Sequence, residues 1–165
     1  MTFRIRAAAA VAAGALIVAA GLVAGTVRTE AAADAKTTIE TRQKAMKELG
    51  GHMKAINGFV EKGEGDAAMV AEHARAIAAA SPKIPELFPA GTGLADGHGV
   101  KTAAKPEIWS DHAGFEKAAA NLGEKAGGLE KAAAGGDKQA IAAAFAELGK
   151  DGCGGCHSKF RQKQD

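Results

Sequence analysis

The stretch IAAAFAELGKDGCGGCHSKF, residues 141–160, has the pattern of a single helix. Its first half is rich in alanine, the strongest helix former. Four large apolar residues, one glycine and the second cysteine recur at steps of three or four, which places them on one helical face. This face carries Ile141, Phe145, Leu148, Gly152, Cys156 and Phe160.

Three segments upstream repeat the helical spacing, over residues 37–60, 67–80 and 110–134. In each, the apolar residues fall on one face. The predicted inward residues are Ile39, Arg42, Met46, Leu49, Met53, Ile56 and Val60 in the first segment, Val70, Ala74 and Ile77 in the second, and Phe115, Ala118, Leu122, Ala126, Leu129 and Ala133 in the third.

The connections between these segments differ in length. Glycines followed by aspartate predict short turns and new N-caps around residues 63–66 and 135–137. Residues 81–108 hold all four prolines and predict a long crossover. Its apolar residues indicate that it packs on the helices: Ile84, Leu87, Phe88 and Ile108. The sequence therefore predicts an all-α fold, a four-helix bundle with one long crossover between helices 2 and 3.

Composition also favours helices over strands. Hydrophobic residues make up 47% of the 165 residues, but aromatic residues make up only 4%. Strands are rich in β-branched and aromatic side chains, whereas alanine favours helix. Because alanine buries little apolar area, a bulky cofactor would supply packing that these helices lack.

The first 33 residues have the layout of an export signal. Arg4 and Arg6 form a basic start, residues 7–27 carry no charge, and residues 31–33 offer a small-residue cleavage site. No adjacent arginine pair is present, which favours the general secretory route. The alternative is an uncleaved membrane anchor, because the uncharged stretch is long enough to span a bilayer. We predict a cleaved signal over residues 1–33 and a folded domain over residues 34–165.

The folded domain has no excess of either charge. The predicted signal contains three of the 21 basic and one of the 19 acidic side chains, so equal numbers remain after cleavage. This balance gives no electrostatic basis for binding nucleic acid.

The motif Cys153-Gly154-Gly155-Cys156-His157 carries the chemistry. It has the form C-x-x-C-H, the attachment sequence of c-type haem, and it contains both cysteines of the chain. On a helix, the two cysteines and the histidine lie at positions i, i+3 and i+4 and share one face. Each thiol can then form a thioether with a haem vinyl group while the imidazole approaches the iron.

Other uses of two cysteines fit this sequence less well. A zinc site would need a second pair of ligands. A thioredoxin-like pair would lie near a βαβ unit, and no strand pattern is present. A disulfide across one helical turn would constrain almost nothing. We therefore predict one covalently attached haem c, with its iron, per chain.

Four stretches of the sequence together resemble a known family: Arg42-Gln43-x-x-Met46-Lys47, Leu87-Phe88-Pro89-Ala90-Gly91-Thr92, Lys105-Pro106-Glu107-Ile108-Trp109 and the segment from Cys153 to Arg161. The sequence resembles the class II cytochromes c, whose best-known members are the cytochromes c prime. The resemblance runs from about residue 37 onward. It implies an antiparallel four-helix bundle with the haem between helices near one end.

The resemblance also implies roles for individual residues. His157 matches the proximal iron ligand, Arg161 the basic residue beside it, and Arg42 a residue near the haem propionates. Arg161 also follows His157 by one helical turn, which places both on the same face. For both arginines the alternative is a solvated charge on a helix surface.

Met46 matches the distal position, on the other side of the iron. In low-spin members of the family a methionine here binds the iron and gives an electron carrier. In cytochromes c prime a bulky apolar residue usually leaves the iron five-coordinate and open to small gases, and some high-spin members have an unligated methionine. A thioether is a good haem ligand, but methionine is also a common core residue. We predict ligation by Met46, with core packing as the alternative and Met53 as the rival ligand.

The other histidines are weaker candidates for the iron. His52 lies to the side of the Met46 stripe, by about 90° on a helical projection. The remaining three have no partner at helical spacing: His73, His98 and His112.

Two functions follow from these features. The first is single-electron transfer in the periplasm with redox partner proteins. The second is binding of nitric oxide or carbon monoxide to a five-coordinate haem. No carboxylate or histidine pair forms a visible distal acid–base set, so we do not expect an enzyme. We expect no membrane attachment after cleavage of the signal and leave a homodimer open.

Overall fold

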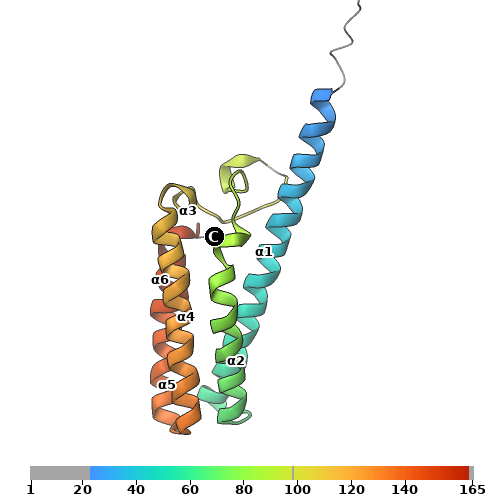
Figure 1. Ribbon diagram of the computed structural model, residues 1–165. Helices are drawn as coiled ribbons and strands as arrows, with labels where there is room; N and C mark the ends of the chain where they lie inside the picture. The colour runs from blue at the N-terminus through green and yellow to red at the C-terminus, as the bar shows by residue number, and fades with distance from the viewer. Residues whose placement is uncertain (1–22, 98, 164–165) are drawn as a thin grey trace, which may run out of the picture.

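The computed structural model describes residues 23–97 and 99–163 (Figure 1). Most of the predicted signal and His98 lie outside these residues. Within the part that is described, no helix is both long enough and apolar enough to cross a membrane.

The architecture is the predicted four-helix bundle. The first three helices are α1 (Val23–Lys62), α2 (Ala67–Ala80) and α4 (His112–Gly135). The fourth consists of α5 (Lys138–Glu147), a π-helical turn η4 (Leu148–Cys153) and α6 (Gly154–Phe160). Successive helices run in opposite directions, as Figure 1 shows.

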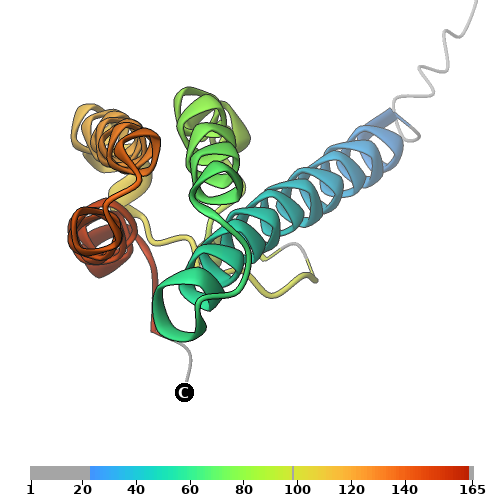
Figure 2. The same ribbon diagram turned by 90° about the horizontal axis from the view of Figure 1, so that it is seen from below.

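Helix α1 is longer than the sequence pattern predicts. The pattern favours residues 37–60, whereas the helix begins at Val23, inside the predicted signal. Its N-terminal end extends beyond the other helices in Figure 1 and diverges from them in the view from below in Figure 2. The spacing of apolar residues shows only where a helix packs against its neighbours. The alanine-rich segment before residue 37 also forms helix because alanine has a high intrinsic helix propensity.

The predicted turns and caps are confirmed. Asp66 caps α2 by accepting a hydrogen bond from the Met69 amide at 2.8 Å. Asp137 caps α5 by accepting from the Gln139 amide at 2.8 Å. Gly136, at the C-terminus of α4, has a φ of 74°, in the left-handed region that favours glycine.

The core lies mainly between α2 and α4, with α1 and the fourth helix around them. The buried residues of α2 are the three predicted ones. On α4 one prediction is wrong by a single position, because Ala119 is 2% exposed and Ala118 is only half-buried. Two alanines in succession carry no difference in size, so the sequence pattern could not choose between them.

The long crossover packs on the bundle as predicted. It contains three short 3-10 turns, η1 (Ser81–Lys83), η2 (Pro85–Leu87) and η3 (Leu94–Asp96), and the short helix α3 (Glu107–Ser110). Ile84 and Ile108 are buried. The crossover is therefore part of the fold, and it brings its residues up to one end of the bundle.

Candidate functional site

The C-terminal helix widens into a π turn that ends at Cys153, the first residue of the C-x-x-C-H motif. Single π turns within α-helices often occur at functional sites. Gly152 lies in this turn and faces α4. A Cβ atom at this position would lie 3.1 Å from Leu148 Cδ1 and 3.2 Å from Leu122 Cδ1. The glycine thus permits the motif to start close against α4.

Cys153 and Cys156 are free thiols, half-buried against the core. Burial raises the pKa of Cys153, and burial together with the nearby Cys153 raises the pKa of Cys156 to about 11. Both sulfurs are therefore protonated at neutral pH. This state does not suit a reactive redox thiolate, whereas the apolar surroundings suit the vinyl edge of a porphyrin.

His157 follows on α6 and exposes its side chain. Partial burial of the ring, together with the positive charge of Arg161, lowers its pKa. The neutral imidazole that results is the form that binds metals. Arg161 is itself exposed. Arg161 follows the end of α6 at Phe160 in extended backbone, so it does not continue the helical face of His157 that the spacing predicts, and its predicted role beside the haem is untested.

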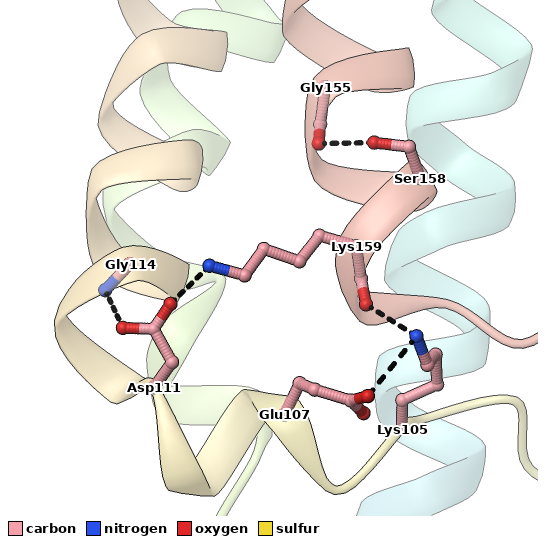
Figure 3. Close-up of polar contacts among 7 residues, drawn as sticks. All are labelled: Lys105, Glu107, Asp111, Gly114, Gly155, Ser158 and Lys159. Carbon is pink, nitrogen blue, oxygen red and sulfur yellow. Dashed lines mark hydrogen bonds and ion pairs between the residues drawn. The ribbon is translucent and has the colours of Figure 1, made fainter.

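An ion pair holds α6 against the start of α4 (Figure 3). Lys159 Nζ contacts Asp111 Oδ2, and the other oxygen of that carboxylate accepts a hydrogen bond from the Gly114 amide at 3.1 Å. Both donors lower the pKa of Asp111, with Lys159 the larger cause. One carboxylate therefore caps α4 and anchors the helix that carries the motif.

The crossover contacts the same helix through Lys105. Its Nζ donates to the Lys159 carbonyl at 2.9 Å and lies 3.4 Å from Glu107 Oε1 (Figure 3). Its amide donates to the Phe160 carbonyl at 3.1 Å, and the Gln162 amide donates to the Ala103 carbonyl at 2.8 Å. These two backbone bonds form a short antiparallel bridge between the crossover and the residues after the motif.

Three aromatic rings connect the crossover, α4 and α6. Phe88 and Phe115 meet edge to face with ring centroids 5.0 Å apart, and Phe115 and Phe160 do so at 5.2 Å. Such pairs add stability beyond the apolar area that they bury. They give the end of the bundle that holds the motif a rigid apolar base.

Arg42 is only 3% exposed, so the alternative of a solvated helical charge is wrong. Its guanidinium donates to Thr92 Oγ1 at 2.9 Å, to the Thr92 carbonyl at 2.5 Å and to Thr102 Oγ1 at 2.6 Å. It also lies 4.8 Å from the centroid of the Phe88 ring. Burial lowers its pKa. The sequence pattern placed Arg42 on the inward face but did not identify Thr102 as its partner.

The charge of Arg42 meets no opposite charge in the part of the chain that the structure describes. Among the described residues, no carboxylate lies within ion-pair distance of its guanidinium. A buried charge is costly unless an opposite charge meets it. The haem propionates are carboxylates, so this unbalanced cation fits the role that the family resemblance implies for Arg42.

Met46 lies on the inward stripe of α1, where the packing is incomplete. Ile39 and Ile56 on this stripe are buried, whereas Met46, Leu49 and Met53 between them are only half-buried. Met46 contacts the same core as the two cysteines. The middle of α1 therefore presents thioether sulfurs at a place that the other helices do not fully cover.

Met53 approaches the C-terminal helix directly. Its Cε atom lies 3.9 Å from the position that a Cβ atom on Gly149, in the π turn, would occupy. Met53 therefore remains a rival to Met46 as an iron ligand.

These residues together fit a covalently bound haem. Two neutral thiols and a neutral imidazole lie close together along the C-terminal helix, and half-buried methionines lie on α1. A buried cation, Arg42, has no anionic partner among the described residues. Thioether formation, iron ligation and propionate binding each need one of these groups.

Comparison with known proteins agrees with this site. The family model described as cytochrome C' matches residues 37–161. Cytochrome c' of Pararhodospirillum photometricum is 39% identical over 125 residues, which are 75% of this chain and 95% of that protein. The crystal structure of cytochrome c' from Thermochromatium tepidum has a TM-score of 0.69 and 35% identity, and the match covers 78% of this chain and 97% of that one.

A nitric oxide complex of a mutant cytochrome c prime from Alcaligenes xylosoxidans is also similar. It has a TM-score of 0.66 and 27% identity, with 78% of this chain and 97% of that chain covered. The chain therefore belongs to the cytochrome c' family, and it is a haem protein with one covalently bound haem c per chain.

Proposed function

We propose that this protein transfers single electrons. When bound, the haem supplies an iron that accepts and returns one electron. Cys153 and Cys156 would hold it through thioethers, and His157 would donate an imidazole nitrogen on one side. Arg42 would meet a propionate with the positive charge that its neutral partners leave unbalanced.

The half-buried thioether of Met46 carries this proposal. Met46 lies one turn after Arg42 on the stripe of α1 that faces the core. If Met46 held the iron together with His157, its sulfur would raise the reduction potential of the haem. Two protein ligands would also favour electron transfer, because the iron would keep the same ligands in both oxidation states.

Gas binding is the second candidate function. The similar protein from Alcaligenes xylosoxidans is described as a nitric oxide complex, which favours a site open to nitric oxide here as well. In this alternative Met46 would only pack against the core, and the distal side would admit nitric oxide or carbon monoxide. The incomplete cover over the middle of α1 is compatible with it.

An absorption spectrum of the purified protein distinguishes the two functions. Electron transfer with Met46 as ligand predicts a low-spin ferric protein with a weak sulfur-to-iron charge-transfer band near the red end of the spectrum. The ferrous protein should then bind carbon monoxide slowly. A high-spin ferric spectrum with rapid carbon monoxide binding would reject electron transfer as the first choice and favour gas binding.

We further infer that the protein is exported and acts in the periplasm. Covalent haem attachment and the signal-like layout of residues 1–33 support this location. Its partners would be redox proteins that dock near the exposed side of α6. The absence of enzymatic activity remains a prediction, and a homodimer is left open.

A further inference from the structure

The crossover holds the guanidinium of Arg42 in one orientation. Three neutral oxygens accept its hydrogen bonds: Thr92 Oγ1 at 2.9 Å, the Thr92 carbonyl at 2.5 Å and Thr102 Oγ1 at 2.6 Å. Both hydroxyl groups are fixed in turn, because Thr92 Oγ1 donates to the Pro89 carbonyl at 2.8 Å and Thr102 Oγ1 accepts from the Ala104 amide at 3.2 Å. The arginine and both threonines are buried, so the guanidinium has little freedom to turn away.

Thr102 contributes to this arrangement through its side chain alone. Thr92 also offers its backbone carbonyl, which a different side chain at that position would keep. The Thr102 hydroxyl has two lone pairs, and it accepts from both Arg42 and the Ala104 amide. We propose that Thr102 is a positioning residue that holds the charge of Arg42 beside the haem and so raises the reduction potential of the iron.

The place of Arg42 in the fold supports this role. Its guanidinium lies over the Phe88 ring, 4.8 Å from the centroid. Phe88 packs on Phe115, and Phe115 packs on Phe160. Phe160 follows His157 by three residues on α6. Arg42 therefore lies at the end of the bundle that carries the C-x-x-C-H motif.

A cation at this place favours the reduced iron. Ferric haem carries one more positive charge than ferrous haem, so a nearby positive charge disfavours the ferric state. Arginine stays protonated even when it is buried. No carboxylate of residues 34–97 or 99–163 lies within ion-pair distance of Arg42 to cancel its charge. A haem propionate would favour ferric iron, and the guanidinium would offset that negative charge.

The inference rests on the bound haem and deepens the proposed electron transfer, because the potential decides which partners can exchange electrons with the iron. Its test is independent of that function. A high-spin spectrum would reject electron transfer, yet the potential of each variant could still be measured and compared.

Potentiometric titration of the holoprotein, followed by absorption, tests the proposal. Thr102→Val removes the hydroxyl at nearly constant volume, so Arg42 loses one acceptor and the potential should fall. Thr102→Ser keeps the hydroxyl and should restore the wild-type potential. Thr41→Val is the matched control, since the exposed Thr41 hydroxyl donates to the Thr37 carbonyl at 2.8 Å. It should leave the potential unchanged.

A double-mutant cycle shows whether Thr102 acts through Arg42. Arg42→Gln should lower the potential by itself, and Thr102→Val should add no further shift in that background, because residues that act as a unit are not additive. An equal shift in both backgrounds would overturn the proposal. A wild-type potential in Thr102→Val, with a loss of stability alone, would also overturn it, since the hydroxyl would then serve only the fold.

Two further measurements complete the test. The absorption spectrum of Thr102→Val should match that of the wild type, and a change of iron ligands in this variant would overturn the proposal. Thr102→Ala is the second variant without the hydroxyl, for use if Thr102→Val does not fold. Its potential should fall in the same direction, and a wild-type value would again reject the role of Thr102.

Discussion

Arg42 of α1 donates a hydrogen bond to Thr102 of the crossover, 60 residues further along the chain, at 2.6 Å. The same guanidinium holds both the hydroxyl and the carbonyl of Thr92. One buried side chain thus ties the first helix to two separate points of the crossover. The cost of its unbalanced charge falls when an anion lies beside it.

Replacing Arg42 should destabilise the protein. Arg42→Gln removes donors to three buried oxygens, so we expect a loss of about 2–4 kcal/mol in the free energy of unfolding. Urea unfolding of the holoprotein, followed by circular dichroism, measures this loss. Lys44→Gln on the exposed side of the same helix is the control and should change stability by less than about 0.5 kcal/mol. Equal losses in the two variants would show that the contacts of Arg42 contribute nothing.

The predicted thioethers should make the haem resistant to extraction. Haem should remain with the polypeptide through acid–acetone treatment and denaturing electrophoresis. Cys153→Ser or Cys156→Ser should each reduce the fraction that remains, because each removes one of two covalent bonds. Haem staining of the gel gives the measurement. Complete extraction from the wild-type protein would contradict covalent attachment.

Replacing Met46 should open the iron if its sulfur is the ligand. Met46→Ala should convert a low-spin ferric protein to a high-spin one, abolish the sulfur charge-transfer band and speed carbon monoxide binding to the ferrous form. Stopped-flow absorption measures the binding rate. Met53→Ala is the necessary comparison, since Met53 is half-buried on the same stripe. Loss of the band in that variant instead would assign the ligand to Met53.

A larger side chain at Gly152 should destabilise the protein. Gly152→Ala introduces a Cβ atom at 3.1–3.2 Å from two leucine methyl groups. Overpacking of this kind costs about 1–3 kcal/mol, and the better helix propensity of alanine offsets part of it. Gly128→Ala on α4 is the control, because no other atom lies within 4 Å of its new Cβ. Thermal unfolding should show a lower melting temperature for the first variant and an equal or higher one for the second.

The anchor between Asp111 and Lys159 should weaken in acid. Hydrogen bonds lower the pKa of Asp111 in the folded protein, so its contribution to stability is present above the ordinary aspartate pKa. That contribution disappears as the pH falls through the lowered value. Asp111→Asn should therefore reduce the urea midpoint at pH 7, and the difference between the two proteins should shrink as the pH falls through the lowered pKa of Asp111, where the carboxylate takes up a proton. A constant difference between the two proteins at all pH values would contradict this assignment.

Periodicity predicted most of the fold because large apolar residues mark an inward face. The three buried residues of α2, the caps at Asp66 and Asp137 and the packed crossover all follow from local chemistry. In a run of alanines all side chains have the same size, so the pattern could not show that Ala119 rather than Ala118 is buried.

A local sequence pattern could not predict contacts between segments that are distant in the chain. The placement of Arg42 on an inward stripe was predictable, but its bonds to Thr92 and Thr102 depend on the path of the crossover. The hydrogen bond between the His52 and His73 rings depends likewise on how α1 meets α2. The sequence did not predict the π turn, because residues in a wider π turn are of the same types as those in an ordinary α-helix.

The antiparallel bridge between the crossover and residues 160–162 has a mechanical consequence. A pull applied at Lys163 reaches Gln162 and Phe160 first, and their backbone bonds to Ala103 and Lys105 lie between that point and His157. Load would pass into the crossover, and from there to the start of α4, before it strained the turn that carries the cysteines. A tether fused after residue 163 should therefore leave the spectrum of the protein unchanged, which makes this end a suitable point for attachment to an electrode.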